Sequence, residues 1–219
     1  MSTPQYGRTR TGAIALGIAG LLFVVYQAVA PRVDQTTLAG ARSWSSPAWV
    51  TAHVAAIAGF ILIGCGLVAV HAALSATRGE PAAFRAMLTG WIGIGLTLPY
   101  YGAEVYGLNA IGRRAVADGD ASLVGLAEDF RMDSTAVTIF ALGLAAVALA
   151  GIVVAAAVWR SGRLPRWSAV PLAAVLVTLI PQFFVPQPLR IAHGAALAVA
   201  AVVLAVALWR SAAADAGAA

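Results

Sequence analysis

The chain contains long runs of apolar residues that are almost free of charge, and these runs limit its fold more than any other feature. A helix of about 20 apolar residues crosses the hydrocarbon core of a bilayer, which is about 30 Å thick. Of the 219 residues, 61% are hydrophobic and only 11% are charged, whereas soluble domains carry about 25% charged residues. The composition excludes a soluble globule and a disordered chain, and a single cysteine excludes a disulfide scaffold.

The apolar runs predict an all-α fold: a polytopic membrane protein with a bundle of six transmembrane helices, in one domain that covers residues 1–219. The predicted spans cover residues 11–30, 47–74, 84–111, 134–159, 167–185 and 189–209. In the connection 113–133, Leu123, Leu126 and Phe130 recur at helical spacing among acidic residues. This pattern indicates a short amphipathic helix in the membrane interface, which is either a lid or a passive connector.

The positions of the arginines predict the orientation in the membrane. All 14 basic residues are arginine, and they lie at the ends of the apolar segments. More of them fall on the side of the two termini, so the positive-inside rule predicts a cytoplasmic-membrane protein with both termini in the cytoplasm. A net charge of +5 could indicate nucleic-acid binding, but arginines that are scattered at the ends of segments are topology signals. The expected partners are therefore membrane lipids and a lipophilic substrate, with no nucleic acid. The sequence contains no Walker or dinucleotide glycine pattern.

Two segments, 47–112 and 135–188, resemble each other weakly. Each begins close to a Val-Thr pair, and each contains a Leu-containing stretch that ends at a proline, Pro99 in the first and Pro181 in the second. Either the segments are a duplicated helical hairpin, or alanine-rich membrane helices resemble each other by composition.

Ionisable residues within the apolar segments are functional candidates because they are costly at membrane depth. His53, Glu104, Arg190 and His193 come from distant parts of the sequence, yet all lie near the non-cytoplasmic ends of their predicted helices. The topology predicts that two imidazoles, one carboxylate and one guanidinium meet in one layer.

Aromatic residues surround this layer and predict a cavity. Pro99 kinks its helix, and Tyr100 and Tyr101 lie four and three residues before Glu104, on the same face. The residues predicted to contact a substrate are Trp49, Tyr100, Tyr101, Gln182, Phe183, Phe184 and Arg190. In the alternative interpretation, the aromatic residues are interfacial anchors and Glu104 forms a structural ion pair with Arg190.

The first functional hypothesis is acid catalysis on a lipophilic substrate. A carboxyl group in a dry aromatic setting stays protonated, and Glu104 could then protonate an alkene or an epoxide. Aromatic faces would stabilise the resulting carbocation. His53 and His193 would accept the final proton or tune Glu104.

The stretches Pro-Tyr-Tyr-Gly-Ala-Glu at 99–104 and Leu-Arg-Ile-Ala-His-Gly at 189–194 resemble those of small multi-pass actinobacterial membrane proteins. In size, helix number and a lone intramembrane acid, the chain is also similar to bacterial membrane-bound type II terpene cyclases. That similarity implies a prenyl-type substrate, a terpenoid product and no cofactor. The Asp-x-Asp-Asp motif of soluble cyclases is absent, so Glu104 is the expected acid, with Asp129 and Asp133 in reserve.

Two other hypotheses remain open. His53, His193 and Glu104 form a set that suits Zn, Fe or Cu, and two histidines on different helices suit haem. Alternatively, the chain is a small transporter or a lipid-binding accessory protein in which Glu104 and Arg190 form a gate or a proton relay.

Overall fold

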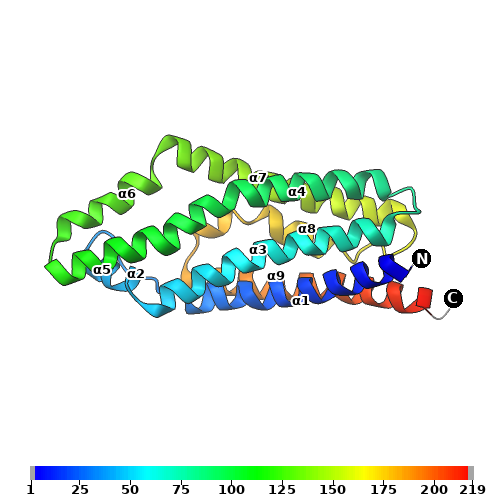
Figure 1. Ribbon diagram of the computed structural model, residues 1–219, viewed down its shortest axis with the longest axis horizontal. Helices are drawn as coiled ribbons and strands as arrows, with labels where there is room; N and C mark the ends of the chain where they lie inside the picture. Colours follow the sequence, from blue (N-terminus) through cyan, green and yellow to red (C-terminus); the bar gives the residue numbers. More distant parts are fainter. Residues whose placement is uncertain (1–2, 217–219) are drawn as a thin grey trace.

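The computed structural model describes residues 3–216 of the chain, and all regular secondary structure in that range is helical (Figure 1). The α-helices are α1 (Thr3–Val29), α2 (Leu38–Trp44), α3 (Pro47–Leu74), α4 (Glu80–Gly102), α5 (Leu108–Asp118), α6 (Gly125–Arg131), α7 (Ser134–Ser161), α8 (Val170–Val177) and α9 (Gln187–Ala216). A π-helix, η1 (Ala103–Gly107), joins α4 to α5, and two 3-10 helices, η2 (Ala121–Val124) and η3 (Pro181–Phe184), precede α6 and α9.

Within residues 3–216, four helices are long and apolar enough to span a membrane: α1, α3, α7 and α9. The prediction of six transmembrane helices is therefore wrong. In place of the predicted span 167–185, α8 has eight residues, a length of about 12 Å, and the 3-10 helix at Pro181 follows it. Residues 84–111 are helical, but polar and glycine residues lower the hydropathy of the segment. It is divided among α4, η1 and α5.

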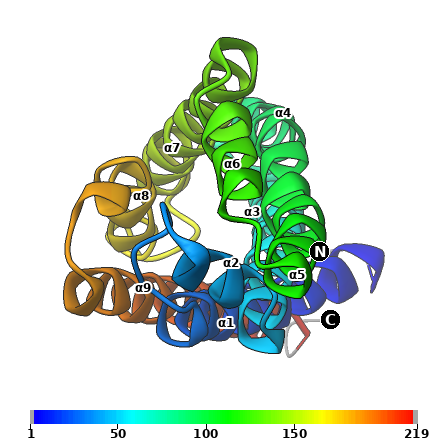
Figure 2. The same cartoon turned by 90° about the vertical axis from the view of Figure 1, so that its left-hand side faces the viewer.

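The helices of the membrane region form a ring, which is visible in the end-on view of Figure 2. Helix α1 packs between α3 and α9, α4 packs between α3 and α7, and α8 packs between α7 and α9. Helices α4 and α8 are not candidate membrane spans, but each has a position in the ring. They correspond to the predicted spans 84–111 and 167–185. Large apolar side chains on the outside of the long helices, such as Leu21, Ile61, Leu149 and Val199, are exposed, as expected for a surface that faces lipid.

The close approach of α4 and α7 depends on glycine. A Cβ atom on Gly93 would lie 2.7 Å from the Gly143 carbonyl oxygen and 2.8 Å from the Val147 nitrogen, which are backbone atoms that cannot rotate away. At Gly95, one half-turn further along α4, a Cβ atom would meet no atom within 4 Å.

We expect Gly93→Ala to destabilise the protein, by about 1–3 kcal/mol for an overpacked contact, because α4 and α7 would have to separate. The matched variant Gly95→Ala should keep or raise stability, since alanine is the better helix former. Thermal unfolding in detergent measures both effects. Equal melting temperatures for the two variants would contradict the close backbone contact between these helices.

Beyond the membrane region, α2, α5, η2 and α6 form a cap with its own small core, at the end opposite to the termini (Figure 1). Trp49 of α3 completes this core, whose buried residues from the cap are Ala41, Trp44, Leu108, Ala115, Val124 and Ala127. The amphipathic segment predicted in 113–133 is present as η2 and α6, but it packs onto α2 and α5. Leu123 and Phe130 of the predicted apolar face pack against this core, whereas Leu126 is exposed.

Candidate functional site

Glu104 lies at a break in the hydrogen-bond pattern of the long helix formed by α4, η1 and α5. The backbone N–H of Leu108 donates to the Ala103 carbonyl, one residue further back than in an α-helix. In a regular α-helix the Glu104 carbonyl would accept from the backbone N–H of Leu108. Here it accepts a hydrogen bond from Trp49 Nε1 at 2.7 Å. Single-turn π-helices of this kind recur at functional sites. Here the turn ties the backbone at Glu104 to the beginning of α3.

The Glu104 carboxylate forms a bidentate ion pair with Arg131 at the end of α6. Arg131 Nε donates to Oε1 at 2.6 Å and Nη2 donates to Oε2 at 2.8 Å, and Nη1 donates to Gln35 Oε1 at 2.6 Å. The two charged side chains are only 11% and 17% exposed. Burial acts to lower the pKa of the Arg131 guanidinium, but the hydrogen bonds and the charge of Glu104 raise this pKa above its usual value. Both oxygens of the Glu104 carboxylate are thus occupied by guanidinium donors.

His53 lies next to this ion pair and is 3% exposed. Its Nδ1 lies 2.8 Å from the Trp49 carbonyl oxygen and so carries a proton that it donates there. Its Nε2 lies 4.0 Å from Glu104 Oε2, which is too long for a direct hydrogen bond. The Trp49 ring covers the imidazole at a centroid distance of 4.1 Å. Nε2 is thus the nitrogen that remains for exchanging a proton with Glu104 or with a bound molecule.

These groups open onto a cavity of about 780 Å³ between the ring of helices and the cap. Of the residues predicted to contact a substrate, Trp49, Tyr100, Tyr101, Phe183, Phe184 and Arg190 line it. His53 and Glu104 line it as well, and the remaining lining residues are Tyr26, Arg32, Val33, Gln35, Arg131, Met132, Val137 and Phe140. The volume is that of a small-molecule site, in which a largely apolar lining with a few polar groups is typical.

Phe140 on α7 is the centre of the aromatic wall, and sequence analysis missed it. Its ring stacks on Tyr100 at 4.2 Å and lies 6.0 Å from the Tyr101 ring and 5.9 Å from the Phe183 ring. A signal was present in the sequence: Phe140 follows the beginning of α7 by six residues, as His53 follows the beginning of α3. The two side chains therefore lie at similar depths from the cap.

His193 and Gln182, which were predicted as site residues, do not line the cavity. The Nε2 of His193 faces α8, 3.2 Å from the Val175 carbonyl and 3.1 Å from Thr178 Oγ1. Gln182 is buried and accepts a hydrogen bond from Gln27 Nε2 at 3.0 Å. Because His193 is bonded to α8 and does not line the cavity, the predicted set of His53, His193 and Glu104 is not assembled.

A metal or haem site on that set therefore lacks its third group. In the part of the chain that the structure describes, no three His, Cys, Asp or Glu side chains gather closely enough to hold a metal ion. Pairing of His53 with His193 as haem ligands is likewise not supported, because His193 is bonded to α8.

The ion pair between Glu104 and Arg190, which the alternative interpretation offered, is not formed. Arg190 donates from Nε to the Val185 carbonyl at 2.9 Å and from Nη2 to the Phe183 carbonyl. The partner of Glu104 is Arg131, which lies in the connection that the sequence identified only as a lid or a connector. Neither reserve acid lines the cavity: Asp129 is exposed, and Asp133 accepts from the Ala136 backbone N–H at the beginning of α7.

Comparison of the chain with protein-family models, with curated proteins and with solved structures finds no match.

Proposed function

We propose that the chain is a membrane-embedded enzyme that cyclises or isomerises a lipophilic, prenyl-type substrate by proton transfer. The observation that carries the proposal is the His53–Glu104 pair, whose two side chains are nearly buried and face an aromatic cavity of about 780 Å³. An ionisable pair at this depth is costly to maintain, which favours a functional role.

The proposed proton donor is Nε2 of His53. Glu104 is not the donor as long as it is paired with Arg131. Burial of the His53 ring disfavours an imidazolium, whereas the carboxylate 4.0 Å away favours it. His53 would give this proton to an alkene carbon, where the π electrons form the new C–H bond, or to an epoxide oxygen, where a C–O bond breaks. Loss of a proton from the final cation back to His53 restores the enzyme, so an isomerisation needs no other reactant. Release of Arg131 would let Glu104 act as the donor itself.

The lining suits the proposed carbocation. Arene rings stabilise a nearby cation through their quadrupoles. Tyr26 and Tyr101 lie beside His53, and Phe140 lies beside Tyr101 on the cavity wall. None of the described lining residues is Ser, Thr, Cys or Lys, so no alkyl hydroxyl, thiol or amine faces the cation.

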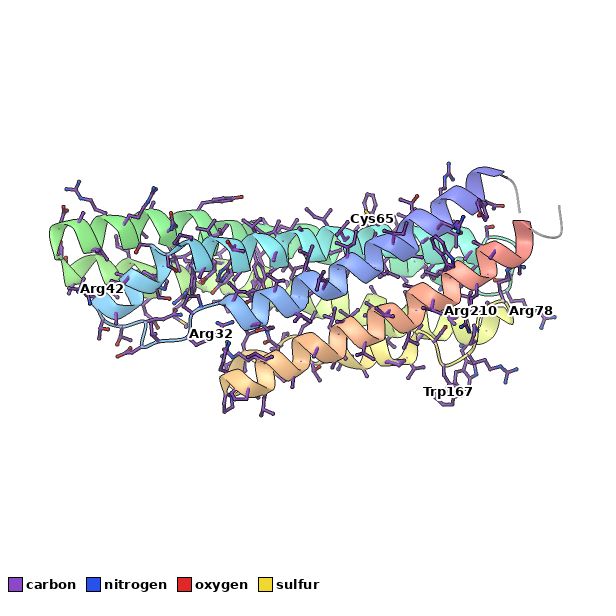
Figure 3. All side chains as sticks on the ribbon, turned by 90° about the horizontal axis from the view of Figure 1, so that it is seen from below. Arg32, Arg42, Cys65, Arg78, Trp167 and Arg210 are labelled. Carbon is purple, nitrogen blue, oxygen red and sulfur yellow. The ribbon has the colours of Figure 1, made fainter. Side chains whose placement is uncertain are left out.

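The proposed orientation places both termini in the cytoplasm and the cavity near the opposite membrane surface. Arg78 and Arg210 lie at the end of the molecule that holds the termini, as Figure 3 shows, and other arginines join them at that end of the chain's long helices. The positive-inside rule favours the cytoplasm for this end. The fold is consistent with this orientation, because α1 begins and α9 ends at the end of the molecule opposite to the cap.

Deuterium labelling tests the proposal directly. Purified protein would be incubated in D2O with a panel of prenylated compounds and prenyl epoxides. The expected product is an isomer of the substrate that carries one solvent-derived deuterium on carbon or on the new hydroxyl, so analysis after back-exchange in H2O separates the two. Glu104-dependent flux of a compound across liposomes without any conversion would instead establish the transporter alternative and overturn the proposal.

A prediction for Phe140 follows from the proposed cation. Phe140→Leu should lower turnover about tenfold, since a desolvated cation–π contact is worth up to about 2 kcal/mol, while substrate affinity changes little. The matched variant Phe84→Leu changes an exposed ring of α4 that does not line the cavity, and it should leave turnover nearly unchanged. Initial rates and dissociation constants measure both, and equal rates for the two variants would argue against a cation beside Phe140.

A further inference from the structure

We propose that the molecule bound in this cavity is an amphiphile with an anionic head group, a phosphate or a carboxylate, which Arg32 and Arg190 bind at the cavity wall. This assignment gives the substrate class for the proposed function and rests on that function for the reaction of the tail. Binding itself does not depend on the reaction.

The first observation is the charge of the lining. Three guanidiniums line the cavity, those of Arg32, Arg131 and Arg190, but only one carboxylate does, that of Glu104. Glu104 is fully engaged by Arg131. Among the described side chains, no carboxylate forms an ion pair with Arg32 or Arg190. Two positive charges beside an apolar chamber are therefore without a counter-ion.

The second observation is an unused donor on Arg32. Its Nε donates to Gln187 Oε1 at 3.2 Å, and its guanidinium carbon lies 5.9 Å from the centre of the Tyr26 ring. The Nη2 atom is buried and has no hydrogen-bond partner among the described groups. A buried guanidinium nitrogen without an acceptor is unfavourable, and a phosphate or carboxylate oxygen would satisfy it.

The third observation is the position of Arg190 in the first turn of α9. The beginning of a helix carries a partial positive charge, so a cation there is unfavourable and an anion is favourable. Neutral carbonyls of Phe183 and Val185 accept from Nη2 and Nε of Arg190, and no described group accepts from Nη1. An anion would pair with this guanidinium and with the helix end together.

Gln187 joins the two arginines into one site. It accepts from Arg32 through Oε1 and donates through Nε2 to the Gln27 carbonyl at 2.7 Å. It also lies three residues before Arg190, on the same face of α9. The loop after α1 and the beginning of α9 are thereby held with both guanidiniums on the same cavity.

The position of this site limits the distance between head group and reacting bond. The Tyr26 ring lies 5.9 Å from the Arg32 guanidinium and 5.5 Å from the His53 ring. One aromatic ring therefore separates the head-group site from the imidazole. A tail that extends past Tyr26 places its first few carbon–carbon bonds next to His53, so a short prenyl phosphate or carboxylate fits better than a neutral hydrocarbon.

Binding of two matched probes tests the inference without requiring turnover. Farnesyl monophosphate and farnesol share one tail and differ in charge, and their affinities for the full-length protein in detergent can be measured by tryptophan fluorescence. We expect the phosphate to bind about tenfold to hundredfold more tightly, as for charge-assisted hydrogen bonds. This preference should decline as salt rises. Equal affinities in the wild-type protein would overturn the inference.

Variants then locate the preference. The double variant Arg32→Gln/Arg190→Gln should bind both probes with the affinity of farnesol. Arg42→Gln, a control at an exposed position in the cap that does not line the cavity, should keep the wild-type preference. A double variant that still prefers the phosphate would overturn the assignment of these residues. If the double variant does not fold, the salt dependence in the wild-type protein still shows whether the charge of the head group contributes to binding.

The anionic head group has two sources, and native mass spectrometry distinguishes them. Phospholipid that the wild-type protein retains, that the double variant loses and that farnesyl monophosphate fails to displace would identify a bilayer lipid as the amphiphile. Displacement of the phospholipid by farnesyl monophosphate would identify a substrate site. Phosphate-selective binding without any isomeric product would support this inference while contradicting the proposed function.

Discussion

Glu104→Gln is expected to reduce turnover by about a hundredfold to ten-thousandfold, the range for loss of an acid–base group. Glutamine keeps the shape of the side chain, but it carries neither the charge that stabilises an imidazolium at His53 nor a proton to transfer. Steady-state rates of product formation on the wild-type protein and the variant measure the effect. A variant with full activity would show that Glu104 is not part of the reaction.

The same substitution leaves Arg131 with an amide in place of its bidentate partner, so stability should fall as well. Breaking a buried ion pair from one side costs about 3–5 kcal/mol, and less where solvent reaches the pair. The double variant Glu104→Gln/Arg131→Gln removes both charges and should recover much of the melting temperature while remaining inactive. Recovery of activity in the double variant would mean that the single variant had failed through an unpaired arginine and not through the missing carboxylate.

His53→Asn is expected to lower turnover by a similar factor, about a hundredfold or more, with little change in substrate affinity. Asparagine can still donate to the Trp49 carbonyl from the position of Nδ1, but it has no group in place of Nε2. Added imidazole should restore part of the rate, because it can enter the space that the ring leaves. Rates with and without imidazole measure this rescue.

His193→Asn is the matched control, since His193 faces α8 and does not line the cavity. Its rate should stay within about twofold of the wild-type rate, the scale of a change below 0.5 kcal/mol. Equal losses of turnover in the two histidine variants would indicate that His193 also belongs to the site, as the sequence predicted. Release of a bound metal from the His53 variant would favour the metal hypothesis in place of proton transfer.

The candidate site could be predicted in part because its residues lie at equivalent depths in their helices. His53 and Glu104 are ionisable groups in apolar segments, and Tyr100 and Tyr101 share a helical face with Glu104. Helical periodicity alone places such residues on the cavity side. Phe140 was missed because its signal is only positional: it follows the beginning of α7 by six residues, as His53 follows the beginning of α3. A phenylalanine in an apolar helix is otherwise ordinary. Arg32 was missed because it lies outside every predicted span, where a charge is ordinary.

The ion-pair partner of Glu104 could not be predicted, because it depends on how the connection 113–133 packs against the rest of the cap. Arg131 and Arg190 are both cations near the cap, and the sequence contains nothing that ranks them as partners of Glu104. Packing of η2 and α6 on α2 and α5 brings Arg131 to the carboxylate, whereas Arg190 bonds the backbone around Val185. Similarly, His193 lies at the expected depth but faces α8, an orientation set by helix packing.

The sequence by itself determined that the chain is helical and membrane-embedded, and it located the long helices α3 and α7 almost to the residue. These properties are local, since the length and hydropathy of one segment decide them. Only the tertiary structure decided that four and not six helices are long apolar spans, that Arg131 holds Glu104, and that Arg32 and Arg190 face one cavity. Those outcomes depend on contacts between residues far apart in the chain, and hydropathy and helical periodicity do not specify such contacts.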